Sequence, residues 1–95
     1  MDYQIVANGQ HLAVFNSTHR VMKAESILKS KGCKATLIPA PRALQTDCGL
    51  AIRFDENISE EVMRTLKETD LLPSFLCRRE GDGFIKIEEY THENN

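Results

Sequence analysis

The stretch that decides the fold runs from Ala35 to Phe54 and reads ATLI (Ala35–Ile38), PAPRALQTDCG (Pro39–Gly49) and LAIRF (Leu50–Phe54). It consists of two apolar runs joined by a loop. Pro39 and Pro41 stiffen the start of the loop, because each proline fixes its own φ and pushes the preceding residue toward extended geometry. At the end of the loop Cys48 stands directly before Gly49, where the backbone can turn tightly. We therefore expect two strands joined by a rigid loop, and such loops often carry binding chemistry.

Upstream of this stretch the chain predicts a strand followed by a helix. His11–Phe15 is short and nearly all apolar, as is typical of a strand covered on at least one face. Ser17 or Thr18 then caps a helix that runs to about Ser30, along which apolar residues recur at helical spacing. Gly32 supplies the stop signal.

Downstream, Ser59 is the expected N-cap of a second helix that must end before Pro73. Phe75–Arg79 and Phe84–Tyr90 then read as a closing hairpin. The order predicts an α+β, ferredoxin-like βαββαβ sandwich, with two helices on one face of an antiparallel sheet and an extra C-terminal hairpin strand. Its expected core comprises Leu12 or Val14, Leu28, Ile52, Phe54 and Leu66. Residues 1–10 are predicted to be a leader or flap, residues 11–90 the domain, and residues 91–95 a polar tail.

Composition limits the function classes. The chain has 95 residues, enough for one domain, and its net charge of -2 argues against nucleic-acid binding. Apolar runs are too short to span a membrane and no signal peptide is recognisable, which indicates a cytoplasmic protein. Three cysteines without a Cys-x-x-Cys pair argue against disulfides and against structural zinc. We therefore expect no metal and no cofactor.

The predicted topology places chemistry around Cys48. Right-handed crossovers bring the turn before the first helix next to the Pro39–Gly49 loop. The helix N-terminus favours an anion there, either a thiolate or a bound ligand. Arg42 and His19 are the candidate cations. The candidate anion-binding set is Ser17, Thr18, His19, Arg20 and Gly49. The alternatives are an ordinary loop thiol, an exposed His19 without a role, and an Arg42 that only bonds loop carbonyls.

Several of these segments together resemble a small family of selenium/sulfur carrier-like domains. The resemblance rests on FNSTH (Phe15–His19), Ala24-Glu25, Gly32, IPAPR (Ile38–Arg42) and CGLAIRF (Cys48–Phe54). Such domains occur alone or fused behind a sulfurtransferase-type domain in a selenium-metabolism protein. Family members usually place small serines between the arginine and the cysteine, whereas Leu44–Asp47 fills the gap here. The resemblance implies a persulfide or selenosulfide held on Cys48, with donor and acceptor proteins as partners.

These observations leave two main functional hypotheses. The first is a sulfur or selenium carrier or accessory domain in which Cys48 is the carrier thiol and Arg42 and His19 stabilise the anion. The second is a non-catalytic module that binds a small anion or docks a protein, with Cys48 only structural. RNA binding has little support because no RRM-like aromatic motif is present. Whether the protein is an enzyme stays open, since no base, metal set or phosphate loop accompanies the thiol. The donor, the acceptor, the element carried and the oligomeric state also stay open.

Overall fold

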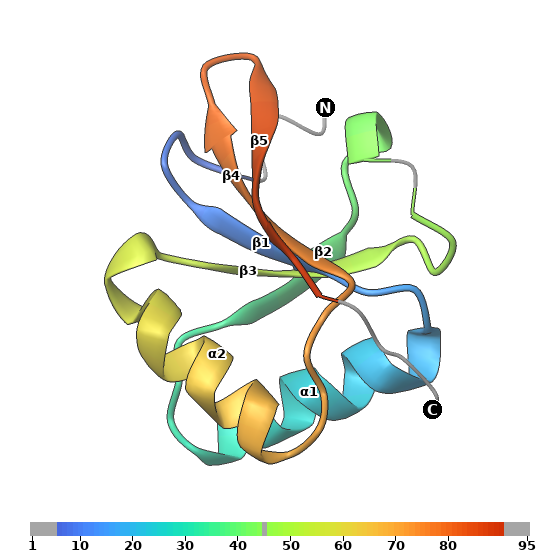
Figure 1. Cartoon of the computed structure of the whole chain (residues 1–95), viewed down its shortest axis with the longest axis vertical. Helices are drawn as coiled ribbons and strands as arrows, with labels where there is room; N and C mark the ends of the chain where they lie inside the picture. Colours follow the sequence, from blue (N-terminus) through green and yellow to red (C-terminus); the bar gives the residue numbers. More distant parts are fainter. Residues whose placement is uncertain (1–5, 45, 91–95) are drawn as a thin grey trace.

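The computed structural model describes residues 6–44 and 46–90 and shows two helices on one side of an antiparallel sheet (Figure 1). The elements in chain order are β1 (His11–Val14), α1 (Thr18–Ser30), β2 (Thr36–Pro39), the 3-10 helix η2 (Arg42–Leu44), β3 (Leu50–Phe54), the 3-10 helix η3 (Glu56–Ile58), α2 (Ser59–Glu68), β4 (Phe75–Glu80) and β5 (Gly83–Glu89). The predicted α+β class, with an antiparallel sheet and two helices, is confirmed.

Within the described residues the sheet has five strands in the order β2-β3-β1-β4-β5, and every neighbouring pair is antiparallel. Val14 at the end of β1 pairs with Ala51 near the start of β3 and with Phe75 at the start of β4. Pro39 at the end of β2 pairs with Leu50 at the start of β3. The ends of β1 and β2 and the starts of β3 and β4 therefore meet at one end of the sheet.

Helix α1 forms as its sequence predicts. The Ser17 hydroxyl oxygen accepts a hydrogen bond from the Arg20 backbone N–H at 3.3 Å, which satisfies one of the free donors of the first turn. Gly32, just beyond the helix, has a φ of +79°, which costs an L side chain energy but not glycine. The predicted N-cap and stop signal are both confirmed.

Helix α2 begins differently from the prediction, because Ser59 is not its N-cap. The 3-10 helix η3 precedes it, and Ile58 occupies the cap position without a side-chain hydrogen bond. Because the Ile58 N–H already donates to the Asp55 carbonyl oxygen at 3.1 Å, the chain is turned before α2 starts. The Ser59 hydroxyl oxygen lies instead 3.1 Å from Nδ1 of His11 on β1. A tertiary contact has taken the side chain that the local pattern assigned to capping.

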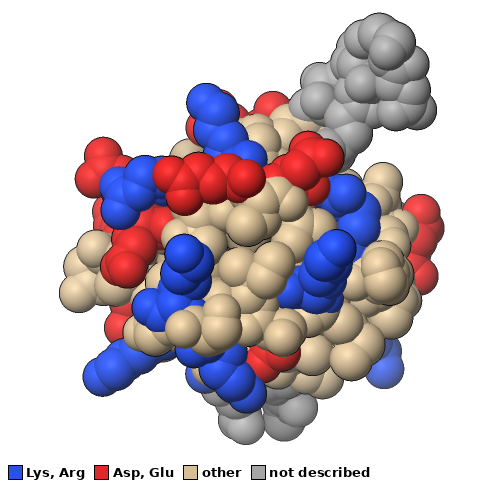
Figure 2. Space-filling view, turned by 90° about the horizontal axis from the view of Figure 1, so that it is seen from below, with Lys and Arg blue, Asp and Glu red and all other residues tan. Residues whose placement is uncertain are grey.

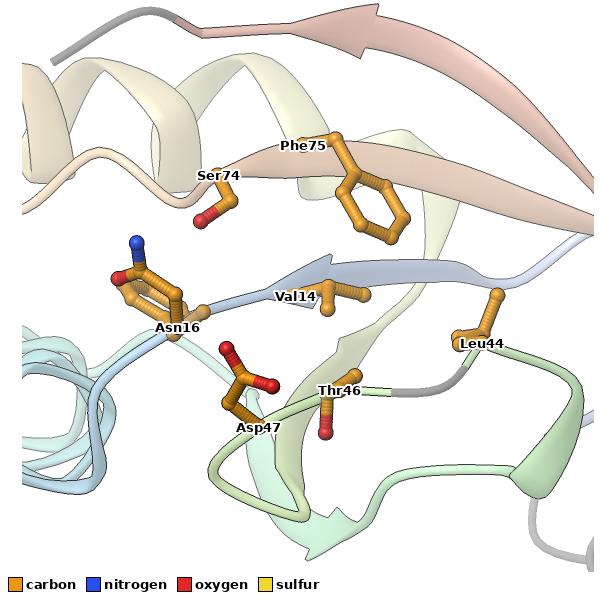
Figure 3. Close-up of a pocket in the computed structure, with 8 residues that line it drawn as sticks. Val14, Asn16, Leu44, Thr46, Asp47, Ser74 and Phe75 are labelled. Carbon is orange, nitrogen blue, oxygen red and sulfur yellow. The ribbon is translucent and has the colours of Figure 1, made fainter.

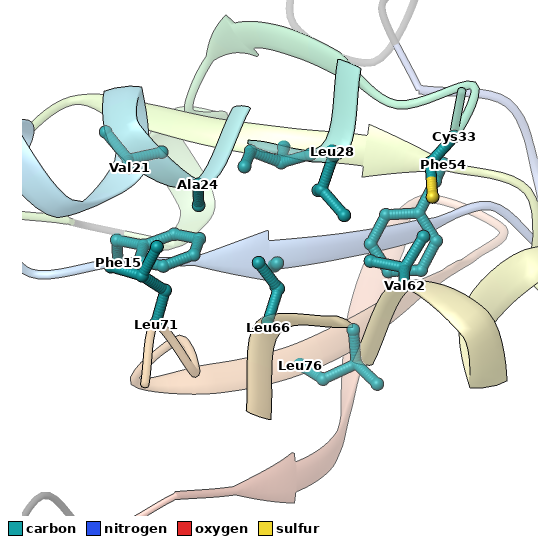
Figure 4. Packing of buried hydrophobic residues seen from close by; sticks show 12 residues of the cluster. Phe15, Val21, Ala24, Leu28, Cys33, Phe54, Val62, Leu66, Leu71 and Leu76 are labelled. Carbon is teal, nitrogen blue, oxygen red and sulfur yellow. The ribbon is translucent and has the colours of Figure 1, made fainter. Parts of the chain in front are cut away.

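The helix-covered face of the sheet packs the larger hydrophobic cluster (Figure 4). Its buried members are Ala13, Phe15, Val21, Ala24, Leu28, Cys33, Ile52, Phe54, Val62, Leu66, Leu71 and Leu76. They include four of the predicted core residues, Leu28, Ile52, Phe54 and Leu66. Burial of these side chains is the main term that holds the two helices on the sheet.

The other face of the sheet carries a second, smaller cluster. Its buried members are Val6, Leu12, Val14, Ile38, Ala51 and Cys77, and Leu44, Phe75 and Phe84 pack against it. Leu12 and Val14 are thus buried as predicted, but on the face away from the helices. Because alternate side chains of β1 enter the two clusters, this central strand is buried on both faces.

The segment before β1 lies against β4. Val6 is fully buried, and the Gly9 N–H donates to the Arg79 carbonyl oxygen at 2.9 Å while the Arg79 N–H donates to the Gln10 carbonyl oxygen at 3.0 Å. Residues 1–5 and 91–95 lie outside the described residues, and with them half of the predicted leader and the whole polar tail. The division into leader, domain and tail stays a prediction. No helix in the described part of the chain is long and apolar enough to cross a membrane.

Candidate functional site

Cys48 lies where the loop after β2 returns to β3. The Ala40 N–H donates to the Gly49 carbonyl oxygen at 2.9 Å, which closes the base of this loop. The Gly49 N–H donates to the Thr46 hydroxyl oxygen at 2.9 Å, and Gly49 has a φ of +72°. That backbone angle is accessible to glycine at little cost, so Gly49 allows the tight turn that follows the cysteine.

The Cys48 thiol is half-buried and faces the side of the sheet that the helices cover. It packs against the larger hydrophobic cluster and donates to the Phe15 carbonyl oxygen at 3.2 Å and the Leu50 carbonyl oxygen at 3.4 Å. A thiolate has no proton to donate to either oxygen. Ionised Cys48 would therefore have to turn its sulfur away from both carbonyls before it reacts.

The other two cysteines are less accessible, and all three are free thiols. Burial raises the pKa of the Cys33 thiol, and the charge and hydrogen bond of nearby Glu61 raise it further. Burial raises the pKa of Cys77 to about 12, with Lys86 acting in the opposite direction. Because the thiolate is the reacting species, both groups are poor nucleophiles near neutral pH. Cys48 is the one cysteine of the described chain that is not buried.

The N-terminus of α1 lies close to Cys48, because the Phe15 carbonyl oxygen that the Cys48 thiol contacts stands two residues before the Ser17 N-cap. The Arg20 side chain donates to the carbonyl oxygens of Asp70 and Leu72, at 3.0 and 3.4 Å, and so ties α1 to the loop after α2. Thr18 and His19 are exposed in the first turn of the helix. Whether His19 assists Cys48 stays a prediction.

Arg42 opens η2, and η2 lies beside β5. Leu44 of the same short helix packs on the smaller cluster, on the opposite face of the sheet from the one that the Cys48 thiol contacts. Arg42 itself is exposed, and its pairing with Cys48 stays a prediction.

A small hollow of about 120 Å³ opens beside this loop (Figure 3). It is lined by Val14, Phe15, Asn16, Leu44, Thr46, Asp47, Ser74 and Phe75. These residues come from the end of β1, the loop before β3 and the start of β4, so these three segments meet at one end of the sheet. None of the lining residues was predicted from the sequence to be a ligand contact. The predicted topology could have pointed to them, because it places the polar residues at the end of one strand and at the start of another together at one end of the sheet.

A buried histidine occupies the opposite end of β1. His11 is 6% exposed, its ring packs edge-on against Phe54 at 5.8 Å between centroids, and Nε2 has no partner among the described residues. Burial lowers the pKa of His11; the charge of Glu56 opposes this shift and that of Arg78 adds to it. From the sequence, His11 was predicted only to be the first residue of a strand. No group of three or more potential metal ligands occurs in residues 6–44 and 46–90, so His11 is not part of a candidate metal site there.

Comparison with known proteins identifies the family. Residues 10–78 match the family described as "Putative Se/S carrier protein-like", and the chain belongs to it. The chain is also 30% identical over 83 residues to an uncharacterized protein of Methanocaldococcus jannaschii. That match covers 87% of this chain and 38% of the relative, so the chain spans well under half of the relative's length. No solved structure matches the chain.

Proposed function

We propose that the protein is a sulfur or selenium carrier, or an accessory domain in such transfer, and that it holds a persulfide or selenosulfide on Cys48. The observation that carries this proposal is the contrast among the three thiols. Cys48 is half-buried on a loop at the end of the sheet, whereas Cys33 and Cys77 are buried and have raised pKa values. Membership of the Se/S carrier-like family supports the same conclusion.

In the proposed loading step, the Cys48 thiolate attacks the terminal sulfur of a donor persulfide. A new S–S bond forms on Cys48 and the donor leaves as a thiolate, so that no external oxidant or reductant is needed. Transfer to an acceptor thiolate is the same reaction in reverse, and a selenium atom would be carried in the same position. His19 and Arg42 are proposed to stabilise the anion. The backbone N–H groups of residues 17–20 and of Gly49 would contribute to the same field, although those of Arg20 and Gly49 already donate to the hydroxyl oxygens of Ser17 and Thr46.

The proposal also covers the type of fold, the cellular location and the partners. The strand order and the two helices on one face support a ferredoxin-like assignment. We place the protein in the cytoplasm, where thiols stay reduced. The expected partners are donor and acceptor proteins, without a cofactor or nucleic acid. On the face in Figure 2, basic and acidic side chains are interspersed, whereas a nucleic-acid surface would present one sign.

A second function is favoured by one specific observation. The Cys48 thiol already donates to two backbone carbonyl oxygens and packs on the larger cluster. In this alternative Cys48 has a structural role, and the loop binds a small anion or docks a protein without forming a covalent bond.

Intact-mass measurement separates the two functions. Incubation with a cysteine desulfurase and cysteine should add one sulfur atom to the protein. Cys48→Ser should abolish this addition, while Cys77→Ser, the matched control at a buried thiol, should retain it. An unchanged mass for the wild-type protein would eliminate the carrier function. Addition that persists in Cys48→Ser would assign the sulfur to another cysteine.

A further inference from the structure

The hollow beside the loop collects three polar side chains that have no partner among residues 6–44 and 46–90. Asn16, Asp47 and Ser74 lie on the same side of it in Figure 3, and their side chains make no hydrogen bond or ion pair with the described residues. They come from three different segments of the chain. Their convergence is therefore a product of the tertiary fold, not of one local turn.

The opposite side of the hollow is apolar. Val14, Leu44 and Phe75 line it, and all three belong to or pack against the smaller hydrophobic cluster. The hollow thus changes from polar to apolar across its width. At about 120 Å³ it is well below the roughly 300–1,000 Å³ of pockets for drug-sized ligands, so only a small group fits.

The charge of the lining decides the chemistry of the occupant. Asp47 is the charged residue among those that line the hollow, and no lysine or arginine of the described chain is among them. An ammonium group has three N–H donors and no acceptor. A carboxylate oxygen, an amide oxygen and a hydroxyl oxygen supply three acceptors for it. An anion would instead meet the Asp47 carboxylate without a compensating cation.

We propose that this hollow binds a primary alkylammonium group, with the nitrogen at Asn16, Asp47 and Ser74 and the alkyl stem against Val14, Leu44 and Phe75. The group can belong to a free alkylamine or to a lysine side chain of a peptide, which share this chemistry.

The site is separate from the proposed sulfur site. Asp47 and Cys48 are consecutive, but Cys48 packs against the helix-side cluster, whereas Val14, Leu44 and Phe75 on the apolar side of the hollow belong to or pack against the other cluster. Of the residues that line the hollow, Phe15 belongs to the helix-side cluster. Ammonium binding therefore does not depend on the reactivity of Cys48, and Cys48→Ser should leave it unchanged.

The test is a titration monitored by backbone amide chemical shifts, with butylamine as the probe near pH 7 and 1-butanol and butyrate as matched neutral and anionic probes. Butylamine should shift the amides of Asn16, Asp47 and Ser74 and should bind about fivefold more tightly than 1-butanol, the upper range for an exposed ion pair. Raising the salt concentration should reduce this preference. Nα-acetyl-lysine methylamide, compared with butylamine, shows whether the site accepts a lysine within a peptide.

Asp47→Asn should remove the preference for butylamine over 1-butanol, and Ser74→Ala should weaken it. Asp82→Asn, an equal charge change at an exposed turn far along the chain, should leave it intact. Equal binding of butylamine and butanol, stronger binding of butyrate, or a preference that survives Asp47→Asn would overturn the proposal.

Discussion

The two ends of β1 hold their polar groups in opposite ways. At one end the His11 ring is buried, with Nδ1 against the Ser59 hydroxyl and its edge against Phe54. At the other end Cys48 is half-buried, and the side chains of Asn16, Asp47 and Ser74 at the hollow have no partners within the described chain. The packed end buries its histidine within the fold, whereas the open end leaves polar side chains accessible to ligands. Chemistry is therefore to be sought at the open end and stability effects at the packed end.

The largest expected effect is at the packed end. Phe54→Ala should lower the free energy of unfolding by about 3–5 kcal/mol, because the ring is almost fully buried and its removal leaves a cavity. Phe75→Ala, at the half-buried hollow, should cause a clearly smaller loss. Urea denaturation of both variants measures the difference. Equal losses would show that the two ends are packed alike.

Lowering the pH should also act through the packed end. The pKa of His11 is lowered by burial, so below its ordinary value of 6.5 the unfolded chain takes up a proton before the folded protein does. The contribution of His11 to the free energy of unfolding is therefore fully present above that pH and decreases as the pH falls toward the folded-state pKa. Urea unfolding at about pH 7 and about pH 5.5 should show this loss.

The matched variants isolate the histidine. His11→Gln should reduce the pH dependence between these two conditions, whereas His19→Gln, at an exposed position in α1, should preserve it. If Nε2 of His11 were instead held protonated by a partner in the folded protein, the pKa of His11 would be raised and the protein would gain stability as the pH decreases. Higher stability at about pH 5.5 than at about pH 7 would therefore contradict the prediction.

A smaller effect is expected from the turn at the open end. Gly49→Ala should lower the free energy of unfolding by about 1 kcal/mol, because its φ of +72° is unfavourable for a residue with a Cβ atom. Crowding adds nothing, since apart from the chain neighbours no atom of the described residues lies within 4 Å of the added carbon. Gly83→Ala is the control, since Gly83 has equal space and no positive φ. Identical unfolding curves for the two variants would contradict this view of the turn.

Local sequence patterns predicted most of the fold. The alternation of inward- and outward-facing residues in Leu50–Phe54 predicted a strand, and Ser17 and Gly32 predicted the ends of α1. These signals succeed because they depend only on neighbours in the chain. The N-cap assigned to Ser59 was wrong, since its hydroxyl contacts His11, 48 residues away, and η3 turns the chain first. Such long-range competition is invisible to a local pattern.

The candidate site was predictable in part. Cys48 stood out through the prolines before it and Gly49 after it, and the predicted topology placed its loop next to the turn before α1. Asn16 and Ser74 could not be recognised, because each is an ordinary polar residue at a strand end. Only the meeting of three segments makes them neighbours.

The measurement that tests the central claim most directly is the order in which the three thiols react with iodoacetamide in the native protein near pH 7. Cys48 should be alkylated first, well ahead of Cys33 and Cys77, because those two thiols are buried and have raised pKa values. If Arg42 stabilises the thiolate, Arg42→Ala should slow the labelling of Cys48 more at about pH 7 than at about pH 9. Labelling of all three thiols at one rate, or of Cys77 before Cys48, would contradict the assignment of Cys48 as the carrier thiol.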